Sequence, residues 1–454
     1  MANSRKLRSV NLAEHVAAEV TSLLPAHSSI LVGLSGGVDS VVLLHLLHKL
    51  SARFSWEISA LHVHHGISPN ADAWAKFCED LCAELQITLH IERVDIVPFL
   101  HHGVEAAARK LRREAFAEQA CDFVALAHHA DDQVETLFLQ LLRGAGVRGA
   151  SAMPQFITRK GTASLIRPLL HVSRDEILSY ATKHQLGWVE DESNANDSYP
   201  RNFLRHRVLP LLAEKFPAYR NTLARSAEHF AEAGHLLNEM AEQDAAGTID
   251  GNTLSVEALR VLSHSRAKNL LRYFLHGAGV QMPQAIQLDD MLKQLCSARA
   301  DTSVCVSCGD KEVRRYRGKA YVFQALGKFD GNLVMTWEGE NRLGWPALNT
   351  WLNFNPTHGK GISYTKLQRA KVTLRLRQGG ETMLIQSSAG TRTLKNLLQE
   401  KRIPPWFRDR LPMLYCGDEL VCVPGVGTAA AYIAVADEAA VQVELQGAQT
   451  GNCC

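Results

Sequence analysis

The 454-residue sequence has no apolar run approaching the roughly 20 residues of a membrane-spanning helix, and none follows the basic residues 1–8. We therefore expect no signal peptide, no membrane partner and a cytoplasmic location. Its ten cysteines lack paired metal-binding spacing, apart from Cys305 and Cys308. One such pair does not make a four-cysteine zinc site, so these residues are interpreted as two thiols in a strand or hairpin, with metal or redox use left open.

The sequence also lacks a strong excess of charge, because 49 Lys and Arg face 47 Asp and Glu, giving a formal net charge of +2. This balance excludes a protein that binds nucleic acid through bulk charge alone, so a polyanionic partner must be bound by local patches. At this length one hydrophobic core rarely suffices, and two or three domains are expected.

The most informative segment present is SGGVDS at residues 35–40, which lies between an apolar run at 30–34 and a predicted buried helix. A strand, a tight turn and a helix N-terminus in that order form an anion site, because glycines admit close backbone approach and first-turn amides point at the anion. Glycine pairs also occur in plain turns, but we favour a phosphate-binding loop. Its candidate residues are Ser35, Gly36, Gly37, Val38, Asp39 and Ser40.

This loop lacks the lysine of the G-x-x-x-x-G-K-[ST] motif, so it is not the loop that holds the β- and γ-phosphates of a nucleoside triphosphate in that class. Asp39 falls in the first helical turn. There a carboxylate either stabilises the helix dipole or holds Mg²⁺ beside a phosphate, and we assign Asp39 as the candidate metal ligand.

The first 170 residues alternate β-rich runs with helical periodicity, which predicts an α/β fold with a doubly wound parallel sheet. The predicted strands are 30–34, 58–64, 88–94 and 123–127, and the predicted helices are 38–50, 72–85, 104–119 and 132–143. Ligands of such sheets bind beyond the carboxyl ends of the strands. The predicted domains are a catalytic domain at 1–216, a mainly helical middle domain at 217–330, a linker at 331–367 and a small α+β domain at 368–440.

A second polar segment, AHHADDQVET at 127–136, follows the fourth predicted strand. Asp132 and Glu135 have the spacing of a helix N-cap and its N3 partner, which explains only those two residues. His128, His129 and Asp131 also crowd a strand end that faces the loop. Because adjacent turn residues rarely ligate one ion together, we favour roles in binding phosphate, Mg²⁺ or a cationic substrate.

Several basic and polar residues are further candidates. Arg109 and Arg112 lie one helical turn apart and suit a phosphate clamp, although a solvated charged face is the common alternative. At the end of the second strand, His64 is favoured over its neighbours as a site residue. Arg201, Asn202 and Arg205 share a helical face that suits contacts to a carboxylate or a phosphate. A second basic face suits RNA phosphates, with an ordinary solvated surface as the alternative, and it includes Lys371, Arg375, Arg377 and Lys395.

Taken together, these motifs resemble the tRNA(Ile)-lysidine synthetase family of N-type ATP pyrophosphatases. The resemblance is carried by SGGVDS (35–40), HVHHG (62–66), EAAARKLR (105–112), AHHADDQVET (127–136), LLRGAGVRG (141–149), RPLL (167–170) and DESN…RNFLRHRVLP (191–210). The C-terminal residues 379–412 also match the family's pattern. Two residues depart from it: Arg113 replaces the usual Tyr and Glu192 the usual Pro, and neither removes a donor from the loop.

The resemblance implies ATP and Mg²⁺ as substrate and cofactor, with L-lysine and the CAU-anticodon tRNA(Ile) as partners. It implies that residues 35–40 and His64 bind ATP, and that Asp39, Arg109, Arg112 and His129 belong to the catalytic set. Asp131, Asp132 and Glu135 would receive the lysine ammonium group or the metal. The sequence does not determine the oligomeric state, and a homodimer is left open.

Two other functions fit parts of the pattern. A tRNA thiolase of the same superfamily would use extra cysteines near the site, and no cysteine lies near these motifs. A non-catalytic tRNA-binding protein would not need an intact Asp39 and a complete glycine turn. Both alternatives are therefore less favoured than a lysine ligase.

Overall fold

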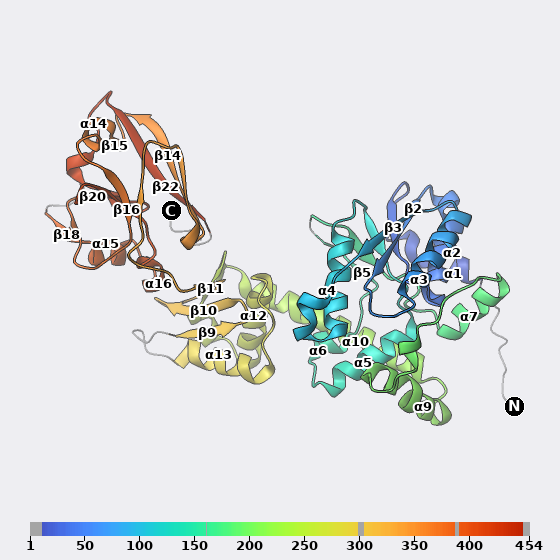
Figure 1. Cartoon of the computed structure of the whole chain (residues 1–454). Coiled ribbons are helices and arrows are strands. Elements are labelled where there is room, and N and C mark those ends of the chain that lie inside the picture. The colour runs from blue at the N-terminus through green and yellow to red at the C-terminus, as the bar shows by residue number, and fades with distance from the viewer. Residues whose placement is uncertain (1–10, 160, 298–303, 386–389, 448–454) are drawn as a thin grey trace. The chain divides into compact units, whose positions relative to one another are not determined.

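The computed structural model describes residues 11–159, 161–297, 304–385 and 390–447. The chain divides into two compact units, one ending at Leu236 and one beginning at Leu237, and each is described by itself (Figure 1). Among the described residues, no helix is long and apolar enough to cross a bilayer.

Unit 1 contains a six-stranded sheet in the order β3-β2-β1-β4-β6-β5, parallel throughout except for the pairing of β5 with β6. The predicted parallel sheet is therefore confirmed. The strands are β1 (Ser29–Gly33), β2 (Glu57–His64), β3 (Thr88–Arg93), β4 (Phe123–Ala125), β5 (Phe156–Ile157) and β6 (Ser164–Ile166).

Helices cover both faces of this sheet because alternate strand residues are apolar on both sides. Ile30 and Val32 of β1 pack into the larger core, whereas Leu31 packs with Phe116 of α4 on the opposite face. The helices are α1 (Leu12–Thr21), α2 (Val38–Phe54), α3 (Ala71–Glu84), α4 (Val104–Ala117), α5 (Ala130–Leu142), α6 (Val147–Ala150), α7 (Arg174–Lys183), α8 (Pro200–Phe203), α9 (Leu209–Lys215) and α10 (Tyr219–Ala245). Short helical segments lie at η1 (Val97–His102), η2 (Glu192–Ala195) and η3 (Leu204–Val208).

The division between the units falls inside α10 and not at the predicted boundary after residue 216. The first half of α10 belongs to unit 1 because its apolar residues pack there. Leu223 contacts the cluster around Val134 of α5, and Ala227 is buried with Leu137 and Ala150.

Unit 2 begins with the second half of α10 and a five-stranded sheet in the order β7-β8-β11-β10-β9. Its strands are β7 (Ile249–Asp250), β8 (Thr253–Ser255), β9 (Cys305–Cys308), β10 (Lys311–Tyr316) and β11 (Lys319–Gln324), and its helices are α11 (Val256–Val261), α12 (His264–Gly277) and α13 (Ala285–Ser297). Cys305 is exposed and Cys308 is buried at opposite ends of β9, as the predicted strand requires.

The rest of unit 2 has a second core formed by two larger sheets, β12-β16-β19-β20-β21 and β13-β14-β22-β15, and the pair β17-β18. Its strands are β12 (Val334–Thr336), β13 (Arg342–Trp345), β14 (Thr350–His358), β15 (Ile362–Ser363), β16 (Val372–Arg375), β17 (Thr382–Met383), β18 (Arg392–Thr393), β19 (Met413–Cys416), β20 (Glu419–Val423), β21 (Gly427–Thr428) and β22 (Ala439–Gly447). Helical segments are η4 (Pro346–Leu348), α14 (Tyr364–Leu367), α15 (Leu394–Glu400), α16 (Pro405–Arg408) and η5 (Ala430–Tyr432).

Residues 331–367 are not the linker that the sequence predicts, because they contain β12 to β15. The longest of these strands, β14, pairs with β22 from Thr350–Gly447 to His358–Ala439. The composition of residues 331–367 does not reveal the pairing of β14, because its partner β22 lies far away in the sequence and no local pattern indicates it.

The fold predicts one pH dependence at the helix that carries the phosphate-binding loop. Burial, with the nearby charges of Lys49 and His184, lowers the pKa of His45 on α2 to about 4, and its Nδ1 lies 3.0 Å from the hydroxyl of Tyr180. The unfolded chain takes up this proton near pH 6.5, so stability is complete above pH 6.5 and falls as the pH drops to 4. We expect His45→Gln to flatten the decline in melting temperature over this window, and an unchanged slope would contradict the assignment.

Candidate active site

The phosphate-binding loop and the second polar segment meet at the point where the strand order reverses. β1 lies between β2 and β4 in the sheet, and the chain reaches β4 only after passing through β2 and β3 on the other side. Residues 34–37 and 126–129 therefore leave the carboxyl ends of neighbouring strands. This is the position at which open α/β sheets bind ligands.

The loop requires glycine at position 36. Gly36 has φ +88°, and a Cβ there would lie 2.8 Å from Cγ2 of Val189. The backbone of Val189 donates a hydrogen bond to the Gly36 carbonyl at 3.0 Å, which holds the segment after α7 against the loop. The close approach and the positive φ together explain why no other residue fits here.

The first turn of α2 presents free amides and hydroxyls. The hydrogen bond from Val41 N to Gly37 O (3.1 Å) is the first of the i→i−4 type, so the amides of Val38 and Asp39 have no acceptor within the helix. The hydroxyl of Ser40 donates to Gly37 O at 2.9 Å and lies 3.1 Å from the hydroxyl of Ser35. This arrangement matches an anion site at a helix N-terminus.

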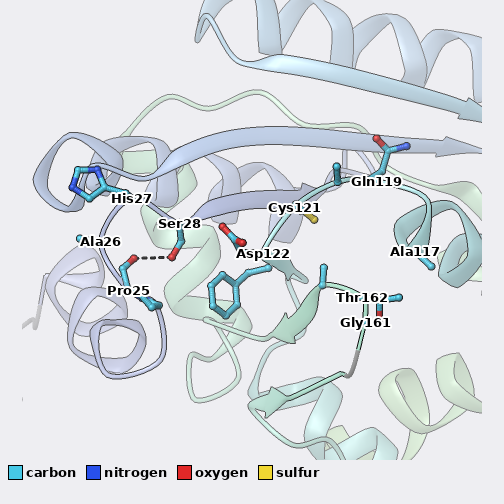
Figure 2. Close-up of a pocket in the computed structure, with 13 residues that line it drawn as sticks. Pro25, Ala26, His27, Ser28, Ala117, Gln119, Cys121, Asp122, Gly161 and Thr162 are labelled. Carbon is cyan, nitrogen blue, oxygen red and sulfur yellow. Dashed lines mark hydrogen bonds between the residues drawn. The ribbon is translucent and has the colours of Figure 1, made fainter.

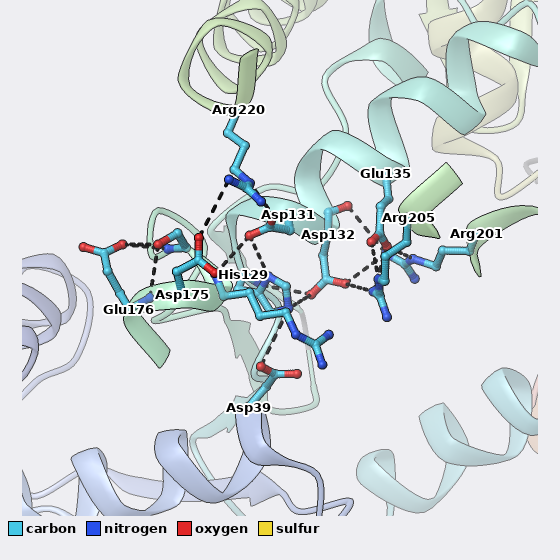
Figure 3. A network of polar contacts seen from close by, with 12 residues as sticks. Asp39, His129, Asp131, Asp132, Glu135, Asp175, Glu176, Arg201, Arg205 and Arg220 are labelled. Atoms are coloured by element: carbon cyan, nitrogen blue, oxygen red, sulfur yellow. Dashed lines mark hydrogen bonds and ion pairs between the residues drawn. The ribbon is translucent and has the colours of Figure 1, made fainter. Parts of the chain in front are cut away.

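A buried histidine lies among three carboxylates above the loop (Figure 3). His129, only 2% exposed, places Nε2 3.7 Å from Asp39 Oδ1 and 3.5 Å from Asp132 Oδ2, and Nδ1 3.7 Å from Asp131 Oδ2. The backbone N–H of His129 donates to Asp132 at 3.0 Å, so Asp132 acts as the N3 partner that the sequence assigns to Glu135. Helix α5 begins at Ala130, two residues earlier than predicted. The N-cap is therefore His129 and not Asp132.

Two of the three aspartates around His129, Asp39 and Asp132, have pKa values shifted in opposite directions. Burial raises the pKa of Asp39 above its usual value and outweighs the opposing charges of His129 and Arg174. Burial also acts on Asp132, but His129 and Arg201 prevail and hold the pKa of that carboxyl below its usual value. Asp39 Oδ1 and His129 Nδ1 are buried without a hydrogen-bond partner.

Glu135 is not open to a substrate in this structure. Its side chain is fully buried, Arg201 donates Nε to Oε2 at 2.7 Å, and Arg205 donates Nε to Oε1 at 2.6 Å and Nη2 to Oε2 at 3.0 Å. Both guanidinium groups also lie within 3.7 Å of Asp132 Oδ1. The predicted helical face of Arg201 and Arg205 therefore points into the site and engages carboxylates of the protein itself.

This pairing predicts a large stability effect. In Glu135→Gln the two guanidinium groups lose their buried counter-ion, and we expect a loss of about 3–5 kcal/mol of unfolding free energy. Urea denaturation measures it. As a control, Glu14→Gln removes the partner of an exposed pair with Arg53 and should leave the urea midpoint unchanged. Equal midpoints for both variants would contradict a structural role for Glu135.

Asp131 is held by residues that the motifs did not indicate. Arg220, from the first turn of α10, donates Nε to Asp131 Oδ1 at 2.5 Å, and the backbone N–H of Arg174 donates to Oδ2 at 3.0 Å. Both partners lie tens of residues from Asp131 in the sequence. A spacing pattern could not have found them, because the two contacts depend on where the first turns of α7 and α10 lie relative to α5.

Of the other predicted residues of unit 1, two arginines are exposed, whereas His64 and Asn202 contact other residues of the protein. Arg109 and Arg112 are exposed on α4. His64 lies at the carboxyl end of β2, and its Nε2 is 3.2 Å from Asp72 Oδ1. Asn202 supports the loop before it, since its amide donates to the carbonyls of Ser193 and Asn196 at 2.8 and 2.9 Å.

In unit 2 the predicted basic residues divide into two kinds. Arg375 donates to Gly417 O at 2.6 Å and pairs with Asp418, and Arg377 pairs with Asp409 and lies 3.7 Å from Glu381. Lys371 and Lys395 are exposed. Of the four predicted basic residues in unit 2, these two lysines are the ones whose side chains make no hydrogen bond or ion pair with a described residue.

The described residues contain no group of three or more His, Cys, Asp or Glu side chains that could hold a metal by themselves. Mg²⁺ in phosphate sites needs only one or two carboxylates, because water and phosphate oxygens complete its shell. The buried and unpartnered Oδ1 of Asp39 beside the loop fits such a ligand.

A separate open depression of about 740 Å³ lies at the opposite edge of the sheet, around the amino ends of β1, β4 and β6 (Figure 2). Its polar lining includes Asp122, which accepts hydrogen bonds from the backbone and hydroxyl of Ser29 at 2.8 Å. Asp122 is thus satisfied within the protein. The depression is remote from the loops that leave the carboxyl ends.

Comparison with known proteins gives matches along most of the chain. The PP-loop domain matches residues 10–212, the TilS substrate binding domain 254–321 and the TilS substrate C-terminal domain 372–445. The tRNA(Ile)-lysidine synthase of Nitrosomonas europaea is 43% identical over 429 residues, 94% of either chain. The chain belongs to the tRNA(Ile)-lysidine synthase family.

A second relative, the tRNA(Ile)-lysidine synthase of Coxiella burnetii, is 38% identical and spans 93% of this chain and 94% of its own. Among solved structures, the U34-tRNA thiolase NcsA of Methanococcus maripaludis, with its [4Fe-4S] cluster, covers 49% of this chain and 78% of its own, at 19% identity and a TM-score of 0.43. That likeness is too weak to bear on function. The family assignment places this chain among the tRNA(Ile)-lysidine synthases and confirms the resemblance seen in the sequence.

Proposed function

We propose that this chain ligates L-lysine to C2 of the wobble cytidine of the CAU anticodon of tRNA(Ile), with ATP converted to AMP and pyrophosphate. The C2 carbonyl oxygen of the base attacks the α-phosphorus of ATP, the bond to the β-phosphate breaks, and pyrophosphate leaves. The ε-amine of lysine then attacks C2, the C–O bond to AMP breaks, and the amine gives up its proton. The product, lysidine, pairs with A instead of G, which changes the codon from AUG to AUA and the tRNA identity from Met to Ile.

The loop at 35–40 supports the first step. The free amides of Val38 and Asp39, with the hydroxyls of Ser35 and Ser40, surround the place where the leaving pyrophosphate is held. Asp39 would hold Mg²⁺ there, and the ion would neutralise charge on the phosphates. Arg109 and Arg112 remain candidates for contacts to ATP or RNA phosphates, and His64 remains a candidate for ATP.

The carboxylates around His129 support the second step. Asp131, Asp132 and Glu135 form a negatively charged cluster that suits the lysine ammonium group, as the sequence predicts. In the structure Glu135 and Asp131 have both oxygens paired, whereas Asp132 Oδ1 makes only ion-pair contacts at 3.4 and 3.7 Å. Binding at Glu135 would require one of its arginines to move.

The observation that carries this proposal is the joint placement of the Gly36 loop and the His129 carboxylate cluster at the switch point of the sheet. The test is incubation of the chain with ATP, radiolabelled lysine and an unmodified tRNA(Ile) transcript. We expect label in the RNA and one AMP per lysine incorporated. Incorporation of sulfur without lysine would support a thiolase, and RNA binding without AMP release would support a non-catalytic binder.

We also propose that RNA contacts extend to unit 2, where Lys371 and Lys395 are exposed. Replacing both by Gln should weaken RNA binding and reduce the slope of log K against log salt by up to about 1.8, at about 0.9 for each phosphate that a lysine neutralises. Arg375→Gln is the control, because its paired guanidinium should affect stability more than RNA affinity. Filter binding at several salt concentrations distinguishes the two, and an unchanged slope for the lysine variant would contradict this role of the two lysines.

A further inference from the structure

Arg167, directly after β6, is a buried arginine without a counter-ion. Its side chain is 6% exposed, Nε donates to His128 Nδ1 at 3.2 Å, and Nη1 donates to Pro154 O at 2.6 Å. Nη2 makes no hydrogen bond to a described residue, yet it is not among the fully buried unpartnered atoms and so keeps access to solvent. Among the described residues no carboxylate lies within ion-pair distance of this guanidinium. Such isolation is costly, since buried charges are normally paired.

The charged surroundings of Arg167 are positive. Burial, together with the charges of Arg109 and Arg159, lowers the pKa of Arg167 to about 10. Its hydrogen-bond acceptor His128 is neutral, because burial lowers the pKa of that imidazole to about 4 against the opposing effect of Asp132. Since Nδ1 accepts from Arg167, the neutral ring carries its proton on Nε2. His128 therefore orients the guanidinium without neutralising it.

The buried Arg410 of unit 2 provides a comparison. It also donates to a backbone carbonyl, that of Gly327, but it lies 4.2 Å from the centre of the Phe329 ring. Arg314 and Glu312 act on it with opposite charges, and the effect of Arg314 is the larger. The favourable contact of Arg410 is therefore the aromatic face. Among the described residues Arg167 has neither an aromatic face nor a carboxylate at contact distance, so an anion from outside the chain would compensate its charge.

The position of Arg167 shows where that compensation comes from. β6 is the neighbour of β4 in the sheet. Leu126 N donates to Ile166 O at 3.0 Å, at the point where the segments that follow β4 and β6 leave the sheet. Arg167 therefore follows a carboxyl end on the same edge as the loop and the His129 cluster. We propose that Arg167 binds a phosphate group of a substrate through Nη2, with His128 and Pro154 O fixing the plane of its guanidinium.

This inference rests on the proposed function, which supplies two polyanions: the nucleotide and the RNA backbone. Arg167→Gln removes the charge, and Arg167→Lys keeps it but loses the planar fork. Isothermal titration with ATP, and salt-dependent filter binding with the anticodon stem–loop RNA, measure each ligand separately. Melting temperature reports folding, and Arg410→Gln controls for loss of a buried arginine, with ATP affinity unchanged.

We expect one ligand to lose at least tenfold in affinity for Arg167→Gln and at least threefold for Arg167→Lys. A loss confined to ATP assigns a nucleotide phosphate, and a loss confined to RNA with a salt slope smaller by about 0.9 assigns a backbone phosphate. If a variant folds and its affinities for ATP and for RNA both change by less than twofold, the inference is overturned. If neither variant folds, the wild-type complex with ATP and RNA decides it: a phosphate oxygen at hydrogen-bond distance from Arg167 supports the inference, and none overturns it. Lysine transfer by the wild-type chain tests the proposed function separately.

Discussion

Replacing Asp39 by Asn is expected to lower lysine-dependent release of AMP by about 10³-fold or more. The amide keeps the shape of the side chain in the first turn of α2, but it removes the negative charge beside the leaving pyrophosphate. Binding of the tRNA should change less than twofold. A discontinuous AMP assay and filter binding on the same preparation measure both quantities.

The stability of this variant is an internal control. Burial raises the pKa of Asp39, so the ionised carboxylate costs stability in the folded state, and that cost grows as the pH rises above its usual pKa and is complete above the raised pKa of the folded state. Asp39→Asn should therefore melt at or above the wild-type temperature near pH 7. Full activity in Asp39→Asn, or loss of activity that merely follows unfolding, would contradict a role in pyrophosphate release.

Gly36→Ala is expected to abolish ATP binding and to lower the unfolding free energy by about 2 kcal/mol or more. A methyl group at φ +88° is strained, and it would lie 2.8 Å from Val189 Cγ2, so the loop must move away from the segment after α7. Titration calorimetry with ATP and urea denaturation measure the two effects.

Gly37→Ala is the matched control one residue later. Gly37 has φ −70°, and a Cβ there would meet only Ser35 Oγ at 3.5 Å, an ordinary contact. We expect no loss of stability and less than a tenfold loss of ATP affinity. If the two alanine variants behave alike, the loop does not depend on the backbone conformation at Gly36.

The parallel sheet and the loop could be predicted because their signals are local. The apolar run before Ser35, the glycine pair and the apolar helix after it lie within about twenty residues. In the structure α2 begins at Val38, the predicted residue, and the predicted strands of unit 1 have their counterparts in β1 to β4. Local periodicity suffices where each element has its own pattern.

The pairings inside the site could not be predicted because they join distant segments. Arg201, Asn202 and Arg205 share a helical face in the sequence, which indicates RNA or a carboxylate, but the carboxylate that binds the arginines is Glu135 of the protein itself. Arg220 reaches Asp131 across 89 positions. The spacing of residues indicates which side chains share a helical face, but it does not indicate which other residues that face contacts.

Transfer of label from α-³²P-ATP in the absence of lysine tests most directly that the base, and not lysine, is activated. We predict that the tRNA(Ile) transcript acquires the label together with pyrophosphate release, and that added lysine then discharges the label as AMP. Label found on lysine, or pyrophosphate release that requires lysine but no RNA, would contradict the proposed reaction.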